Sequence, residues 1–378
     1  MNSASNPAQN EPVETPVIGH QVSPRFERSD EFEADLRRVV DGYFQEAGIS
    51  TRDRLSMFLK TAVLLSLAGM AYSTLLFVAL PFWAVVALVV FLAMVVAGIG
   101  FNVQHDGGHH AYSRHHWINR LAAASLDLIG ASSYVWRWKH DVLHHMYVNI
   151  AGHDTDIDLG PFGRVSPDHP RRMLHRFQHL YIWPLYGILA LKWQWFDDFR
   201  DVLVGRLGAR RMPRPKGWDL ALFLLGRLAF FGWTIGIPSL FHPLGSVIAC
   251  YVLGSVVLGI VLSVVFQLAH AVGEAQFPTP DPVTGKLDAG WARHQVRTTV
   301  DFSRGNAFVT WCLGGLNYQI EHHLFPRISH VHYPALAPLV EAVCLRHGVA
   351  YHDHGGFWKG IASHYRWLRH MGSPAQAS

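Results

Sequence analysis

Four long apolar runs constrain the fold more than any other feature of this sequence. They cover residues 59–80, 82–101, 220–241 and 244–268. Each has about the 20 residues that a helix needs to cross roughly 30 Å of hydrocarbon. Pro81 separates the first two runs, and His242 and Pro243 separate the last two. We therefore expect an all-α integral membrane protein whose four transmembrane helices form two hairpins.

Composition and charge agree with a membrane protein and indicate its orientation. Only 16% of the residues are charged, against about 25% in a typical soluble domain. The hairpin tips, 80–83 and 241–245, contain no Lys or Arg, whereas the segment 102–217 is rich in both. By the positive-inside rule, we expect this segment and both termini to be cytoplasmic. This distribution accounts for the net charge of +4. Since we find no nucleic-acid-binding motif, we expect no nucleic-acid partner.

The sequence divides by composition into six segments. They are a disordered tail (1–28), an amphipathic helix (29–58), the first transmembrane hairpin (59–101), a cytoplasmic cap (102–218), the second hairpin (219–268) and a cytoplasmic C-terminal region (269–378). The amphipathic helix lies either on the membrane surface or against the protein's own soluble part. Further apolar stretches at 121–135 and 180–191 are interrupted by Asp127 and Pro184. We expect interfacial or half-buried helices there.

Histidine is unusually frequent and clustered. The chain has 25 histidines, nearly as many as its 28 Asp and Glu residues. Three clusters and one single histidine lie just outside the spans, on the basic side: His105-Asp-Gly-Gly-His109-His110, His140-Asp-Val-Leu-His144-His145, His270, and Gln319-Ile-Glu-His322-His323. Residues i and i+4 share one face of a helix, and neutral imidazole suits zinc, copper, iron and nickel. His145 stands about 100° from the face of His140 and His144, which suits ligands for two neighbouring metals. The pattern therefore predicts a histidine-rich dimetal site held by a helical cap.

The histidine clusters and their surroundings resemble one known family. With the flanking sequences 136–140, 147–154 and 314–326, they resemble membrane-bound fatty-acid desaturases, most closely the bacterial acyl-lipid or linoleoyl-type ("front-end") group. The resemblance runs from about residue 55 to 355 and implies a centre of two non-haem iron ions with O2 as co-substrate. Carried over position by position, the ligands are His105, His109, His140, His144, His145, His270, His322 and His323, with Gln319 at the ninth, histidine-equivalent position.

Ligand histidines need hydrogen-bond partners for the ring nitrogens that do not bind metal. The carboxylates near enough in sequence are Asp106, Asp141, Asp154, Asp156 and Glu321, and we expect His110 and His153 to be further neighbours of the ligands. The sequence lacks the His-Pro-Gly-Gly motif of the cytochrome b5 domain that is fused to many front-end enzymes. The resemblance then implies a separate electron donor, a ferredoxin or a similar protein.

The resemblance implies O2-dependent desaturation of an acyl chain that is linked to a lipid or to coenzyme A. No amino-acid base can break an unactivated C–H bond, so a metal-based oxidant must supply this chemistry. We expect a narrow apolar tunnel leading to the irons, lined by the spans and by the Trp-rich segments 136–138 and 193–195. One alternative is a membrane hydroxylase or epoxygenase, which could use the same histidine scaffold.

A second alternative is a non-catalytic membrane metal-binding protein or a metal transporter. Transporters usually place charged or ligand residues near the middle of the bilayer. Here the spans contain essentially none apart from Arg227. We expect Arg227 to snorkel towards the interface at Asp219. The spans therefore weigh against transport.

Overall fold

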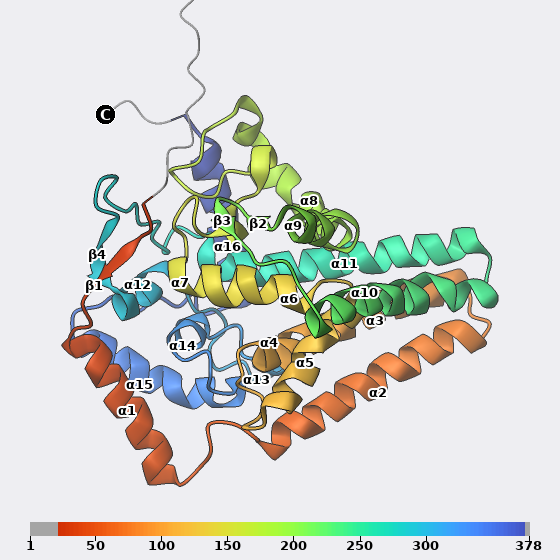
Figure 1. Ribbon diagram of the computed structural model, residues 1–378, viewed down its shortest axis with the longest axis horizontal. Coiled ribbons are helices and arrows are strands. Elements are labelled where there is room, and N and C mark those ends of the chain that lie inside the picture. The colour runs from red at the N-terminus through yellow and green to blue at the C-terminus, as the bar shows by residue number, and fades with distance from the viewer. Residues whose placement is uncertain (1–21, 375–378) are drawn as a thin grey trace, which may run out of the picture.

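The protein consists of four long apolar helices and a helical cap (Figure 1). The computed structural model describes residues 22–374. Four helices in it are long and apolar enough to cross a membrane: Leu55–Phe77, Phe82–Gly108, Trp218–Leu240 and Leu244–His270. They extend away from the cap, and the turns of both hairpins lie at the far end. The predicted fold class, an all-α membrane protein with two hairpins, is confirmed.

The spans are built from the following elements. The first is α2 (Leu55–Phe77); the second runs through α3 (Phe82–Ile99), a π-helical turn (Gly100–Gln104) and α4 (His105–Gly108); the third begins with α10 (Trp218–Phe231); and the fourth is α11 (Leu244–His270). Helix α2 begins at Leu55, four residues before the predicted start of the first span. Residues 55–58, which we placed in the amphipathic segment, therefore belong to the membrane helix.

The cap is made of shorter helices and two small sheets. Its helices are α1 (Glu31–Ala47), α5 (His116–Ile129), α6 (Ser133–Trp136), α7 (His145–Tyr147), α8 (Gln178–Lys192), α9 (Asp198–Val204), α12 (Trp291–Thr298), α13 (Ala307–Cys312), α14 (Gln319–Leu324), α15 (Tyr333–Arg346) and α16 (Phe357–Gly372). Strand β1 (Arg25–Glu27) pairs in parallel with β4 (Lys286–Gly290), and β2 (Arg206–Leu207) pairs antiparallel with β3 (Arg210–Arg211).

Strand β1 lies in the segment that the sequence predicts to be disordered. Residues 1–21 of that segment lie outside the described part of the chain. Arg25–Glu27 is nevertheless ordered, because its backbone pairs with β4 and the ring of Phe26 packs against His294 at 5.2 Å. The partners are supplied by residues more than 250 positions away, so local composition could not reveal the strand.

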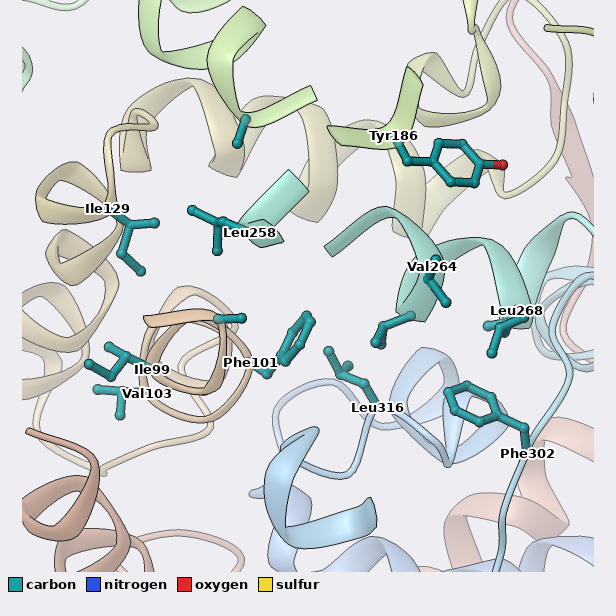
Figure 2. Packing of buried hydrophobic residues seen from close by; sticks show 14 of the residues in the cluster. Ile99, Phe101, Val103, Ile129, Tyr186, Leu258, Val264, Leu268, Phe302 and Leu316 are labelled. Carbon is teal, nitrogen blue, oxygen red and sulfur yellow. The ribbon is translucent and has the colours of Figure 1, made fainter. Parts of the chain in front are cut away.

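Helices α3 and α11 pack against each other, and α8 crosses α11 where glycines let the two backbones meet. A Cβ atom on Gly259 would lie 2.7 Å from the carbonyl oxygen of Tyr186, and one on Gly187 would lie 2.8 Å from a methyl group of Val256. The largest cluster of buried apolar side chains fills the space around this crossing, including Phe101, Leu258, Val264 and Leu268 (Figure 2). Helix α8 is half-buried, as predicted: Ile182 is buried and Ile188 is exposed.

The amphipathic helix α1 packs on the protein itself. Its apolar face consists of Phe32, Leu36, Val40 and Phe44, all of which are buried. These side chains join apolar clusters with residues of α12, α14 and α15. Of the two alternatives that the sequence leaves open for this helix, the structure therefore shows packing against the soluble part.

Arg227 does not snorkel towards Asp219, so that prediction is wrong. Its side chain is buried, pairs with the carboxylate of Asp198 at the start of α9, and donates to the backbone carbonyl of Gly130. Asp219 instead lies 3.8 Å from Arg120. The buried carboxylate and the carbonyl oxygen replace the hydrogen bonds that the guanidinium would make with water. The charged group can therefore remain buried.

Candidate metal centre

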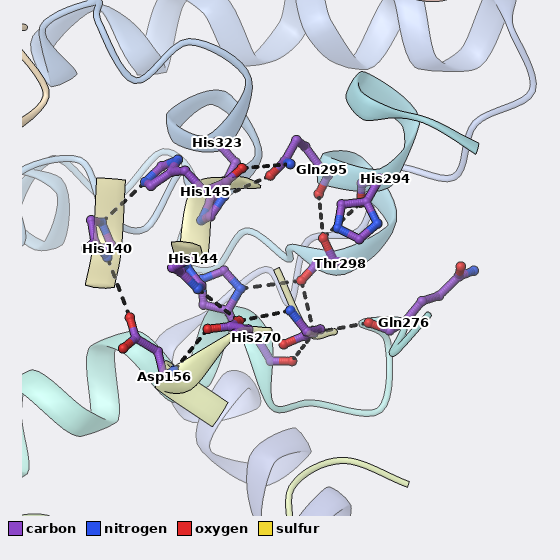
Figure 3. Close-up of polar contacts among 12 residues, drawn as sticks. His140, His144, His145, Asp156, His270, Gln276, His294, Gln295, Thr298 and His323 are labelled. Carbon is purple, nitrogen blue, oxygen red and sulfur yellow. Dashed lines mark hydrogen bonds and ion pairs between the residues drawn. The ribbon is translucent and has the colours of Figure 1, made fainter. Parts of the chain in front are cut away.

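Four segments bring eight histidines together where the cap meets the ends of the second and fourth spans. His105 and His109 come from α4 and its C-terminal end, His270 ends α11, and His322 and His323 lie on α14. The second cluster contributes His140, His144 and His145. Ring centroids of neighbouring pairs are 4.3 Å apart for His145–His323, 4.4 Å for His105–His322 and 4.7 Å for His144–His270. Figure 3 shows how the rings from the different segments face one another.

The second histidine cluster lies on a π-helix, Arg137–His144. The backbone N–H of His145 donates to the carbonyl of His140, five residues earlier. This wider turn brings the ring of His145 to 4.8 Å from that of His140, while His144 is 5.2 Å from it. With α-helical spacing, His145 would lie about 100° from the face of His140 and His144. The π-helix instead turns the ring of His145 towards that of His140, and such turns are frequent at functional sites.

The donor atoms fall into groups that match two neighbouring metal ions. One group holds His105, His109, His140 and His322, and a second holds His144, His270 and His323. A third, of His145, His322 and His323, shares one histidine with each of these two, and a fourth holds His144, Asp154 and Asp156. One potential donor atom from each member lies within 4.8 Å of the others in its group. The Nε2 atoms of His109, His144, His270, His322 and His323 are buried and have no hydrogen-bond partner among the described residues. Buried ring nitrogens without partners are costly, and a metal ion would satisfy them. The residues therefore fit a dimetal centre.

The opposite nitrogens of these rings are held by hydrogen-bond acceptors. His144 Nδ1 donates to Asp154 at 3.0 Å, and His109 Nδ1 donates to Asp141 at 3.2 Å. Each contact fixes the tautomer with the proton on Nδ1 and leaves Nε2 free for a metal. His140 Nδ1 lies 3.8 Å from Asp156. Three predicted carboxylates therefore lie beside ligand rings.

Three acceptors were not predicted from the sequence. They are Gln295, whose Oε1 lies 3.0 Å from His323 Nδ1, the carbonyl oxygen of Thr298, 3.4 Å from His270 Nδ1, and the hydroxyl of Tyr333, 3.4 Å from His322 Nδ1. Each is at least 11 residues from the histidine that it contacts. A search near the histidine clusters therefore could not find them, and only the folded structure shows that the polar side chain of Gln295 is fully buried.

Four other predicted neighbours have different contacts. Asp106 accepts from Ser329 Oγ at 3.0 Å and pairs with His330, and Glu321 accepts from Tyr351 at 2.9 Å. The ring of His110 packs against His116 at 5.2 Å, and that of His153 packs against Tyr147 at 5.6 Å. These four side chains therefore stabilise the surroundings of the site and do not orient a ligand ring.

Burial favours neutral imidazoles in the site, with His144 as the exception. Burial, reinforced by the neighbouring histidines, holds the pKa values of His145, His322 and His323 well below the usual range. Burial lowers the pKa of His140 to about 4, although Asp156 opposes this shift. For His144 burial also acts to lower the pKa, but the Asp154 carboxylate outweighs it and the pKa is raised. Neutral imidazole is the form that binds a metal.

A cavity of about 600 Å³ ends at the histidines. His105, His140, His270, His322 and Gln319 belong to its lining, which also contains charged side chains such as Lys139, Asp156 and Asp197. Apolar residues from α3, the π-helical turn that follows it, α5, α8 and α11 also line the cavity, among them Phe101, Ile129 and Leu258, which appear in Figure 2. The buried Oε1 of Gln319 has no hydrogen-bond partner among residues 22–374. Of the Trp-rich segments, Trp136 and Trp193 contribute to the lining. A helical membrane protein with an apolar cavity that ends at buried histidines has the parts of a metal-dependent enzyme acting on lipid chains.

Comparison with known proteins agrees with this class. Residues 50–355 match the fatty acid desaturase family. The chain is 38% identical to an sn-1 linoleoyl-lipid 6-desaturase of Synechocystis sp., over 92% of this chain and 97% of the relative. It is 38% identical to a protein of the same name from Arthrospira platensis, over 92% and 94%, and 35% identical to an acyl-lipid (8-3)-desaturase of Physcomitrium patens, over 91% and 72%. The chain belongs to the fatty acid desaturase family and is an oxidoreductase of that type.

Proposed function

We propose that this protein is an acyl-lipid desaturase that uses two non-haem iron ions, O2 and an external electron donor. The observation that carries the proposal is the set of buried Nε2 atoms, without partners in the described chain, at the end of an apolar cavity. His105, His109, His140 and His322 would hold one iron, and His144, His270 and His323 would hold the other. His145, which groups with His322 and His323, and Gln319, which lines the cavity, would complete the set of ligand positions. Bound iron would supply the oxidising power that an unactivated C–H bond requires.

The protein's own residues would position the chain and keep water away. The apolar lining from the spans binds the methylene chain by removing its surface from water. Buried side chains around the histidines exclude solvent, so that O2 reduction is confined to the chain in the cavity. Each double bond takes two hydrogens from the chain and two electrons and two protons from outside, and O2 leaves as two molecules of water.

The relatives suggest the acyl carrier and the region of the chain that reacts. The names of the Synechocystis and Arthrospira relatives describe a linoleoyl lipid as substrate and position 6, and a relative from Dictyostelium discoideum, 30% identical, is named a Delta(5) fatty acid desaturase. We infer that this protein, too, acts on a chain esterified to a glycerolipid and inserts the double bond towards the carboxyl end. The charge distribution of the sequence supports a metal site and termini on the cytoplasmic side of a bacterial inner membrane, where a ferredoxin or a similar donor could reach the cap.

The test is fatty-acid analysis of a host that makes linoleate and expresses this chain together with an electron donor. We expect gas chromatography–mass spectrometry to find one new double bond on the carboxyl side of the existing ones. His144→Ala should abolish the product without removing protein from the membrane, whereas His370→Ala, at an exposed histidine of α16, should leave it unchanged. Hydroxylated or epoxidised chains would instead indicate the alternative activity, that of a hydroxylase or epoxygenase. Full activity of His144→Ala would refute the metal centre.

A further inference from the structure

The segment that leads into α8 carries three exposed arginines, Arg171, Arg172 and Arg176. Among residues 22–374, no Asp or Glu side chain lies within ion-pair distance of any of them. We call residues 171–177 the basic segment; Figure 1 shows it at the start of α8.

The surroundings of the basic segment do not neutralise its charge. Arg369, at the C-terminal end of α16, is also exposed, has no carboxylate partner in the described chain, and acts on the charge of His179. The carboxylates nearest in sequence act on other groups: Asp168 acts on Arg164, and Asp158 acts on Arg200 and His169. This corner of the cap therefore has a surplus of positive charge.

The rest of the cap holds the basic segment in place. The ring of His175 is buried; its Nε2 donates to the carbonyl of Pro161 at 3.0 Å, and its Nδ1 accepts from the backbone N–H of Arg172 at 3.1 Å. Arg171 Nε donates to the carbonyl of Gly372 at 2.9 Å, which leaves the outer nitrogens of its guanidinium available. A Cβ atom on Gly372 would overlap the carbonyl oxygen of His175, so the end of α16 meets the segment backbone to backbone. The arginines are therefore presented on a fixed support.

Large apolar side chains are exposed beside these arginines. Met173 is 81% exposed, Phe177 50% and Leu180 58%. Helix α8 continues from here to its glycine crossing with α11, which is one of the four spans. Exposed apolar side chains next to arginines are typical of a segment in the headgroup region of a bilayer, where the apolar groups enter the acyl layer and the cations stay near the phosphates. A soluble acidic protein would match the arginines but not the apolar side chains.

We propose that the basic segment is a binding site for anionic phospholipids. The phosphate groups contact Arg171, Arg172 and Arg176, because guanidinium groups form charge-assisted hydrogen bonds with phosphate. Met173 and Phe177 enter the acyl layer beside them. The site adjoins the acyl cavity, since His175 contacts Pro161 of the cavity lining. It depends on the lipid surface and not on the metal centre, so it holds whether or not the protein is a desaturase.

The test measures lipid binding without turnover. Purified, iron-loaded protein in non-ionic detergent micelles is titrated with dansyl-labelled phosphatidylglycerol, which is anionic, or dansyl-labelled phosphatidylcholine, which is zwitterionic. Energy transfer from the tryptophans of the protein reports binding. The test variant combines three substitutions in the basic segment: Arg171→Gln, Arg172→Gln and Arg176→Gln.

A control variant makes the same change of net charge elsewhere. It replaces three exposed arginines that lie on β1, directly after it and in the first half of α1, at the side of the cap away from the spans (Figure 1): Arg25→Gln, Arg28→Gln and Arg37→Gln.

The wild type should bind phosphatidylglycerol more tightly than phosphatidylcholine. Each substitution in the basic segment should weaken phosphatidylglycerol binding about 3- to 5-fold at low salt, and the triple variant about 30- to 100-fold, with smaller effects at high salt. The control variant should bind both lipids as the wild type does. Met173→Ser removes apolar surface but no charge, and should weaken the binding of both lipids by the same factor.

Melting temperatures without added lipid check that the variants fold. If the triple variant is unstable, Arg172→Gln with Arg176→Gln keeps the contact between Arg171 and Gly372. This double variant should still weaken phosphatidylglycerol binding about 10- to 25-fold.

Three outcomes would overturn the proposal. The first is equal affinity of the wild type for the two lipids, and the second is an equal loss in the test and control variants. The third is a test variant that keeps its lipid affinity but binds reduced ferredoxin more weakly, which would assign the arginines to the electron donor. No step of the experiment needs O2 or electron transfer, so failure of the proposed desaturase function would leave the result unchanged.

Discussion

At the scale of single residues, the site depends on which nitrogen of each imidazole is free. An acceptor on Nδ1 turns Nε2 towards the metal positions, and the structure supplies one for each of several ligands. Gln295 is the most informative of them, because it contacts two histidines of different clusters. Its Oε1 accepts from His323, and its Nε2 donates to the carbonyl of His145 at 3.0 Å.

We therefore predict that Gln295→Leu, which keeps the size of the side chain but removes both contacts, lowers iron affinity about 10- to 100-fold. Iron content measured after equilibration with graded chelator concentrations is the readout. Gln276→Leu makes the same chemical change at an exposed position nearby and should retain the wild-type affinity. Equal iron retention in both variants would show that Gln295 does not orient His323.

The sequence predicts which histidines come together in the cap but only part of what surrounds them. Clusters such as His140–His145 are visible because helical spacing brings their members together along the chain. Asp154 was found because it lies close to His144 in sequence. Gln295 and Tyr333 could not be found in this way, since they reach the ligands only through packing of α12 and α15 against α14.

At the scale of the elements, two contacts hold the cap helices against the spans. The first is the buried ion pair between Arg227 of α10 and Asp198 of α9. Removing one partner of a buried pair leaves a charge without compensation, which typically costs about 3–5 kcal/mol.

Arg227→Met should accordingly destabilise the protein by roughly this amount, as measured by denaturant unfolding in detergent. The double variant Arg227→Met with Asp198→Asn removes both charges and should recover part of the loss. A double variant no more stable than Arg227→Met alone would show that the pairing is not what matters at this position.

The second contact is the glycine crossing of α8 and α11. Gly259→Ala would place a Cβ 2.7 Å from the carbonyl oxygen of Tyr186, so α8 must move away. Overpacking of this kind costs about 1–3 kcal/mol, and movement of α8 also widens the acyl cavity.

We expect a lower melting temperature and lower desaturase activity for Gly259→Ala. Gly254→Ala, on the same helix, meets only a methyl group of Val89 at 3.7 Å and is the matched control. Two variants with the same melting temperature would contradict the close approach of the helices.

At the scale of the whole molecule, the cap contains buried histidines that are not ligands. His364 lies between the hydroxyl of Tyr186 and the carbonyl of Ala271, each 2.7 Å away, and burial lowers its pKa to about 4. Burial lowers the pKa of His294 to about 3. Between the unfolded value of about 6.5 and these lower values, the unfolded chain binds protons that the folded protein does not.

Stability should therefore be full above about pH 6.5 and decrease as the pH falls towards 4. We predict a lower melting temperature at pH 5 than at pH 7, and a smaller decrease for His364→Gln. One such group accounts for at most about 1.4 kcal/mol per pH unit. An unchanged pH dependence in the variant would exclude His364 as a contributor.

The sequence by itself determined the four spans, their pairing into hairpins and most of the histidines that come together in the cap, because length, hydropathy and helical spacing are local properties. Only the tertiary structure decided the inward position of Arg227, the packing of α1, the strand β1 and the distant acceptors of the imidazoles. Each of these depends on a partner from a remote part of the chain, and the free energy of such a contact exists only when the fold has brought the two together.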